Sequence, residues 1–237
     1  MVNVLKKIYA FPFLSAVILW LALPAPFVYV YFFISGFRQN QVRNFLYIQG
    51  KAIQFAICAA SGFNKKIIKK SAPQKPSILI ANHPCTYDTF VFFDFGIKNL
   101  VCIAKGWPFK IPFYGKFIKK AGYINSDNKT SEEIIKEVQD KFAQNLHIGI
   151  FPEGTRKKEI GRFRSLAFKI SIETGADIIP FVIKGLEEML PPGKYLPKQA
   201  PIKYIQLAPI SPKQWTTVEA GALRMAQYVK SIIISQL

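Results

Sequence analysis

The stretch "SILIANHPCTYD", residues 77–88, joins a short apolar run to a loop that carries a histidine and an aspartate. The run "SILIA" has no charged side chain, which is typical of a strand covered on both faces of a sheet. Later runs of the same kind predict further strands, namely "LVCIA" (100–104), "HIGIF" (147–151), "DIIPFVI" (177–183) and "IKYIQL" (202–207).

Helix signals lie between these runs. Thr130 and Glu133 have the spacing of a capping box, which predicts a helix running to about Leu146. Further helices are expected over about residues 165–174 and from about Thr217. Strands that alternate with helices predict a single α/β domain with a mixed, largely parallel sheet flanked by helices. The 237 residues suffice for one such domain.

The composition is both apolar and basic. Half of the residues are apolar, and 32 Lys and Arg against 14 Asp and Glu give a net charge of +18. Such a chain binds either nucleic acid or an anionic membrane surface, and the apolar excess favours the membrane. The three cysteines are not spaced as zinc ligands or as a disulfide framework, which indicates a reducing compartment.

The N-terminal segment is predicted to enter a membrane. No charged side chain occurs between Ile8 and Phe37, but Pro24 and Pro26 interrupt the run and would break or kink a helix. We interpret the run as a half-inserted helical hairpin with both ends cytoplasmic, because basic residues flank it on both sides. A single kinked span is the alternative. The domain division is then 1–70 for the membrane anchor and 71–237 for the α/β domain.

Two segments follow the apolar run. Ala52 to Phe63 is predicted to be an amphipathic helix at the membrane interface. The basic run "KKIIKK", residues 65–70, is either a contact for acidic lipid head groups or an ordinary solvated charge run.

Functional groups of parallel sheets collect on the loops beyond the carboxyl ends of the strands. The loop after "SILIA" offers His83, whose ordinary pKa lies near neutral and suits a general base. Asp88 could hold the other ring nitrogen and stabilise the imidazolium. Alternatively, the histidine caps a turn and the aspartate caps the next helix.

The second loop is "FPEGTR", residues 151–156, after the predicted strand "HIGI". It places a bare glycine amide, a threonine hydroxyl and an arginine guanidinium side by side. That set fits an oxyanion such as a phosphate, which Arg156 could bind bidentately.

With these loops in place, the sequence resembles the glycerolipid acyltransferases typified by 1-acylglycerol-3-phosphate acyltransferase. The resemblance covers about residues 76–210 in four blocks, which occur in the family's order. They are Asn82-His83 with Asp88 (an HxxxxD motif), "AKGWPFKIPFYG" (104–115), the complete "FPEGTR", and "IIPFVIKG" (178–185). The first and third blocks are the specific ones.

The resemblance implies a membrane-bound O-acyltransferase that makes phosphatidic acid. His83 would deprotonate the free hydroxyl of 1-acylglycerol 3-phosphate, which attacks the thioester of acyl-CoA or acyl-carrier protein, and Asp88 would orient His83. The phosphate-bearing acceptor would be held by Asn82, Lys105, Glu153, Gly154, Thr155 and Arg156. Neither a metal, a bound cofactor nor nucleic acid is required. The catalytic domain would lie on the cytoplasmic face of the inner membrane.

The chain departs from the family pattern at Cys85, Asn125, Ser126 and Leu166, and these departures leave the acceptor open. The alternative acceptor is another lysolipid, such as a lyso-ornithine lipid. A thioesterase or lipase would normally carry a G-x-S-x-G motif, which is missing here. A non-enzymatic basic lipid-binding protein would explain the charge but not "FPEGTR".

Overall fold

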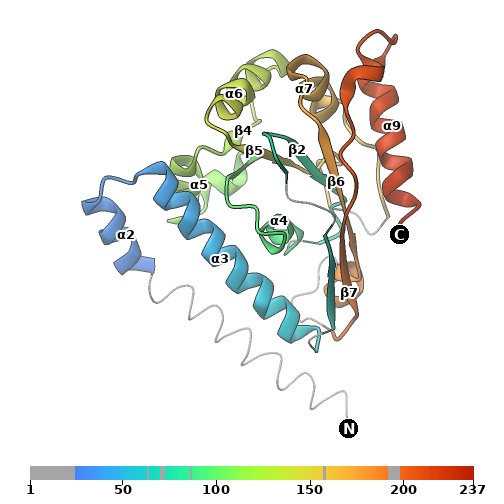
Figure 1. Cartoon of the computed structure of the whole chain (residues 1–237). Helices are drawn as coiled ribbons and strands as arrows, with labels where there is room; N and C mark the ends of the chain where they lie inside the picture. The colour runs from blue at the N-terminus through green and yellow to red at the C-terminus, as the bar shows by residue number, and fades with distance from the viewer. Residues whose placement is uncertain (1–24, 63, 70–72, 86, 157–158, 192–197) are drawn as a thin grey trace.

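The computed structural model describes residues 25–237 except 63, 70–72, 86, 157–158 and 192–197 (Figure 1). The described residues form one seven-stranded sheet in the order β1-β7-β6-β2-β5-β3-β4. Every neighbouring pair is parallel except β6 and β7, so the predicted mixed, largely parallel sheet is confirmed. The strands are β1 Lys65–Ile68, β2 Ile78–Ala81, β3 Leu100–Ala104, β4 Ile124–Asn125, β5 His147–Ile150, β6 Ile178–Lys184 and β7 Ile202–Gln206.

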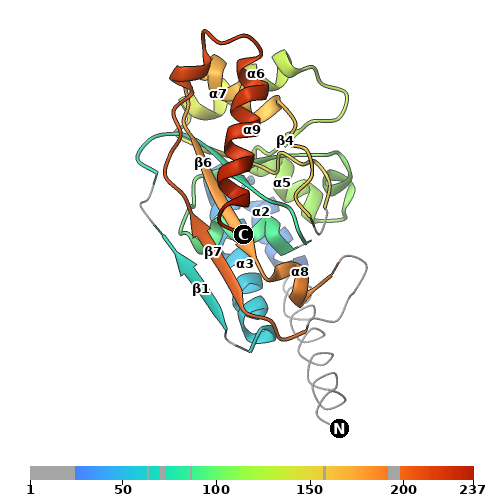
Figure 2. The same ribbon diagram turned by 90° about the vertical axis from the view of Figure 1, so that its right-hand side faces the viewer.

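Helices cover both faces of the sheet, as the alternating pattern predicts (Figures 1 and 2). One apolar core lies under α6 (Ser131–Ala143), α7 (Leu166–Thr174) and α9 (Gly221–Ile234). The other lies under α3 (Gln39–Ala60) and α4 (Val91–Asp94). Because both faces are covered, all four residues of β2 are buried, and its sequence is a continuous apolar run. The remaining helical segments are η1 Tyr87–Phe90, η2 Trp107–Lys110, α5 Tyr114–Ala121, α8 Leu186–Met189 and η3 Pro212–Trp215.

Helix boundaries follow local capping. The Thr130 hydroxyl accepts from the Glu133 backbone N–H and the Glu133 carboxylate accepts from the Thr130 backbone N–H, so the predicted capping box starts α6. Gly175 ends α7 with a positive φ of 71°, a conformation that glycine adopts without strain.

The structure tests the predicted membrane hairpin only in part, because residues 1–24 lie outside the described residues. Beyond them, α2 (Ala25–Ile34) and α3 are joined by a turn with positive φ at Gly36 and Phe37. α3 also takes in most of the predicted interfacial segment 52–63. Among the described residues, no helix is both long and apolar enough to cross a membrane. Membrane insertion of this region stays a prediction.

The "KKIIKK" run is not simply a solvated charge run. Its first four residues form β1, an edge strand paired in parallel with β7. The side chain of Lys65 is only 8% exposed and contacts Asp94 of α4 at 2.7 Å, so Lys65 is not available to lipid head groups. The sheet therefore begins before the expected domain boundary at residues 70 and 71.

Candidate active site

The loop after β2 is tied down at its first residue. The Asn82 side-chain amide donates to the Ile183 carbonyl of β6 at 2.9 Å, and its carbonyl accepts from the Ile183 N–H at 2.8 Å. Asn82 is 4% exposed. Its amide faces the neighbouring strand and fixes the start of the loop that carries His83. The contact of Asn82 with the acceptor stays a prediction.

His83 and Asp88 form a hydrogen-bonded pair, as their five-residue spacing suggested. His83 Nδ1 lies 2.8 Å from Asp88 Oδ2, which also accepts from the Cys85 backbone N–H at 2.9 Å. Asp88 stands in η1 and is fully buried. Burial raises the pKa of the Asp88 carboxyl, while the hydrogen bond to His83 opposes this shift. With Nδ1 facing the carboxylate, His83 Nε2 is the ring nitrogen left to exchange a proton with a substrate.

Phe151 holds the plane of the imidazole. Its ring stacks on His83 with centroids 4.4 Å apart and an angle of 23° between the planes. The sequence placed Phe151 at the end of a strand and at the head of "FPEGTR" but assigned it no role of its own.

Glu153 connects the two loops instead of facing outward. One carboxylate oxygen accepts from the His83 backbone N–H at 2.9 Å, and the other accepts from the Gly161 N–H at 2.8 Å. Glu153 is 5% exposed. These contacts hold the histidine loop in place. The contact of Glu153 with the acceptor stays a prediction.

Gly154 is required by the turn. Its φ is +67°, and a Cβ at this position would lie 3.0 Å from Arg164 Nε. The positive φ alone makes any other residue strained there. Thr155 and Arg156 follow the turn and are exposed.

Arg156 extends toward the loop after β3. Its guanidinium carbon lies 5.7 Å from the centre of the Trp107 ring, a cation–π distance. Arg156 also acts to lower the pKa of Asp88, so its charge is felt at the pair of His83 and Asp88. Lys105 is exposed directly after β3, at the same edge of the sheet. The carboxyl ends of β2, β5 and β3 thus gather one histidine, His83, and two cations, Arg156 and Lys105.

The loop after β3 has its own anchor, which the sequence did not indicate. The Gly106 backbone N–H donates to Asp127 Oδ2 at 2.8 Å, and the Asp127 backbone N–H donates to Asn125 Oδ1 at 2.9 Å. Asn125, one of the departures from the family pattern, therefore supports the loop that carries Lys105. Cys85, another departure, is 3% exposed, which argues against its thiol as an acyl acceptor.

Comparison with known proteins agrees with this geometry. The sequence model of the family described as Acyltransferase matches residues 63–184, just over half of the chain.

The chain belongs to the acyltransferase family.

Several curated relatives of this family member are called 1-acyl-sn-glycerol-3-phosphate acyltransferases. The Limnanthes douglasii protein is 25% identical over 178 residues, which are 72% of this chain and 61% of the relative. The Helicobacter pylori (strain J99) protein is 34% identical over 105 residues, covering 43% and 42%. The chloroplastic Arabidopsis thaliana protein is 26% identical over 123 residues, covering 50% of this chain and 34% of the relative. The match thus spans about one third to three fifths of these relatives' lengths.

A solved structure shares the fold. The crystal structure of the 1-acyl-sn-glycerophosphate (LPA) acyltransferase from Thermotoga maritima aligns with a TM-score of 0.63, covering 96% of this chain and 94% of that one. The two sequences are 20% identical, so this likeness is evidence for the fold alone.

Proposed function

We propose that the protein transfers a fatty acyl group from an acyl thioester to the free hydroxyl of 1-acylglycerol 3-phosphate, making phosphatidic acid. The observation that carries the proposal is the 2.8 Å pair of His83 and Asp88 beside the "FPEGTR" loop. The names of the relatives support the same reaction.

The reaction follows from the geometry of the pair. His83 Nε2 takes the hydroxyl proton while the hydroxyl oxygen attacks the thioester carbonyl carbon. The carbon–sulfur bond then breaks, and the leaving thiolate takes the proton back from the imidazolium. The buried Asp88 carboxylate stabilises the imidazolium between these two transfers. The products are phosphatidic acid and a free thiol.

Arg156 is the residue that we assign to the acceptor's phosphate, with Lys105 beside it. A guanidinium binds a phosphate monoester through paired hydrogen bonds. Arg156 also lies within cation–π distance of Trp107, which favours its guanidinium on this side of the loop. The proposal covers both acyl-CoA and acyl-carrier protein as the donor.

Membrane association is part of the proposal, because acceptor and product both reside in a bilayer. α2 exposes large apolar side chains at a helical spacing, among them Phe27, Tyr31 and Ile34. The surplus of 18 positive charges suits an anionic leaflet. We place the catalytic domain on the cytoplasmic face of the inner membrane.

The test is an acceptor panel assayed with labelled acyl-CoA and with acyl-carrier protein. We expect transfer to 1-acylglycerol 3-phosphate and loss of about 10² to 10⁴ in rate for His83→Ala, with an unchanged melting temperature. Thioester cleavage without any acceptor would indicate a thioesterase. Transfer only to a lyso-ornithine lipid would move the acceptor assignment. Near-normal turnover of His83→Ala would refute the mechanism.

A further inference from the structure

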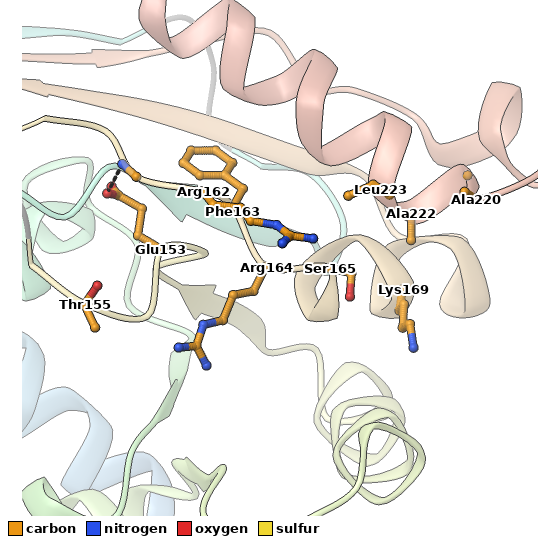
Figure 3. Close-up of a pocket in the computed structure, with 12 residues that line it drawn as sticks. Glu153, Thr155, Arg162, Phe163, Arg164, Ser165, Lys169, Ala220, Ala222 and Leu223 are labelled. Atoms are coloured by element: carbon orange, nitrogen blue, oxygen red, sulfur yellow. Dashed lines mark hydrogen bonds between the residues drawn. The ribbon is translucent and has the colours of Figure 1, made fainter.

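A groove of about 760 Å³ opens beside the "FPEGTR" loop (Figure 3). It runs from this loop along the segment that leads into α7 and ends at the start of α9. The catalytic scheme above makes no use of it. Its lining comprises Glu153, Thr155, residues 161–165, Lys169 and residues 220–223.

The groove is strongly basic. Arg162, Arg164 and Lys169 line it and are exposed, and Figure 3 shows Arg164 and Lys169 extending toward the same side. Within the part of the chain that the structure describes, no ion pair joins any of the three to a carboxylate. Glu132 of α6 feels the charge of Lys169, but only as a longer-range interaction.

Two helix starts add to this positive potential. Ser165 precedes α7, and Ala220 precedes α9, so both helices begin at the groove. Neither helix has an acidic residue in its first turn, where one would normally offset the helix dipole. Ala220, Gly221 and Ala222 are small, so the start of α9 is not screened by long side chains.

The groove connects with the catalytic loop through Glu153. This carboxylate lines the groove and accepts from the His83 backbone N–H, so one end of the groove lies next to the general base. Arg164 packs against Gly154 of the same turn. Arg156 leaves the turn in another direction, toward Trp107. Arg156 is therefore not among the residues that line the groove, whereas Arg162, Arg164 and Lys169 are.

We propose that this groove binds the phosphate end of the acyl donor, the phosphate that acyl-CoA and acyl-carrier protein share in their 4′-phosphopantetheine arm. The inference rests on the proposed transfer reaction, which needs two anionic substrates at one base. Arg156 and Lys105 are assigned to the acceptor, whereas Arg162, Arg164 and Lys169 line the groove and have no part in that assignment. The pantetheine chain would run from the groove past Glu153 and present the thioester at His83.

The test combines binding and kinetics on the full-length protein in detergent. We compare wild type with the double variant Arg162→Gln/Lys169→Gln, and use Lys136→Gln as the matched control. Lys136 is exposed on the neighbouring α6 and lies outside the groove lining. Calorimetry with CoA alone requires no catalysis, so it tests the groove even if the transfer reaction is misassigned.

For the double variant we expect CoA binding to weaken about tenfold and the KM for acyl-CoA to rise equally, since charge-assisted contacts are lost. The KM for acyl-pantetheine, which has no phosphate, and the KM for the lysophospholipid should stay within about twofold. An equal rise for acyl-carrier protein would identify the shared phosphate as the contact. A rise confined to acyl-CoA would add its nucleotide phosphates to the same groove.

Other outcomes overturn the proposal. They are failure of wild type to bind CoA, an unchanged CoA affinity in the double variant, or an equal loss with acyl-pantetheine. A rise confined to the lysophospholipid KM would make the groove an acceptor site. Weaker sedimentation with anionic vesicles, at unchanged CoA affinity, would make it a membrane contact.

Discussion

At the scale of single residues, Asp88 has a functional benefit and a thermodynamic cost. Its carboxyl is buried, and burial raises its pKa from the ordinary value of 3.8. At pH values below the unfolded-state pKa, both states hold the proton and the carboxyl costs no stability. Stability falls as the pH rises from there through the raised folded-state pKa, because the carboxyl ionises more readily in the unfolded chain than in the folded protein. At neutral pH the charge that supports His83 should therefore destabilise the fold.

Asp88→Asn is accordingly expected to raise the melting temperature by a few degrees at pH 7 while lowering the transfer rate at least about a hundredfold. The thermal gain should shrink as the pH approaches 4, where the wild-type carboxyl is increasingly protonated. Thermal unfolding at both pH values and a rate assay check this. The control Asp140→Asn changes an exposed residue of α6 and should alter neither the melting temperature nor the transfer rate. A lower melting temperature for Asp88→Asn at pH 7 would contradict the inference that the buried Asp88 charge destabilises the fold.

Arg156 provides the second residue-scale prediction. Arg156→Ala should raise the KM for the lysophospholipid about ten- to a hundredfold and leave the KM for the thioester nearly unchanged. Arg156→Lys should recover only part of the loss, because an ammonium cannot form the bidentate pair. A two-substrate kinetic matrix separates the two effects. The groove variant Arg162→Gln/Lys169→Gln is the comparison, because it should raise the KM for the thioester instead. A defect of Arg156→Ala confined to the thioester would refute the assignment of Arg156.

At the scale of elements, β1 shows how one basic run divides into a buried and an exposed part. Neighbouring residues of a strand face opposite sides. Lys65 accordingly packs inward, donating to the Gln54 carbonyl at 3.0 Å and to Asp94 at 2.7 Å, while Lys66 is exposed. The pair links the edge strand to α3 and α4.

Lys65→Ala should therefore destabilise the fold by about 2 kcal/mol, and Lys66→Ala by less than about 0.5 kcal/mol. The expected loss of stability for Lys65→Ala is smaller than that for breaking a buried ion pair completely, because Lys51 still contacts Asp94 at 3.2 Å. Denaturant unfolding of the two variants measures the difference. Equal stability of both would mean that the buried contact contributes nothing, and the head-group interpretation of this run would regain support.

The elements also show what the sequence could reveal. The strands β2 and β3 were predicted within one residue at each end, because central strands covered on both faces are continuous apolar runs. β1 was missed because its basic residues become a strand only beside β7, far along the chain. α5 was missed as well, since it follows Pro112 and the positive φ of Phe113. Helix signals there are weak.

The same division holds at the site. The pairing of His83 with Asp88 could be predicted because both residues lie in one loop with suitable spacing. The actual partners of Asn82 and Glu153 could not, since they depend on Ile183 and Gly161, which other segments bring close. A motif indicates which residues matter, but tertiary contacts decide which of them face a substrate.

At the scale of the whole molecule, α2 has two unlike faces. Phe32 is buried in an aromatic cluster with Phe37 and Phe117. Phe27 and Ile34, two turns apart, are 78% and 79% exposed. Such a surface beside an overall charge of +18 is suited to a bilayer, where apolar burial and attraction to anionic lipid act together.

The contributions of apolar burial and of charge to membrane binding should be separable by experiment. Phe27→Asp/Ile34→Asp should weaken flotation with both neutral and anionic vesicles at least about tenfold, because it removes two apolar side chains from the lipid contact. Raising NaCl from about 0.05 M to about 0.5 M should instead weaken only the preference for anionic vesicles, since salt screens the charge. Ile234→Asp on α9, which is 48% exposed, is the matched control and should change neither. Unchanged flotation of the α2 variant would place membrane attachment on another part of the chain, and an equal loss for Ile234→Asp would indicate general misfolding. Weakened flotation with an unchanged melting temperature would establish α2 as a membrane contact of the folded protein.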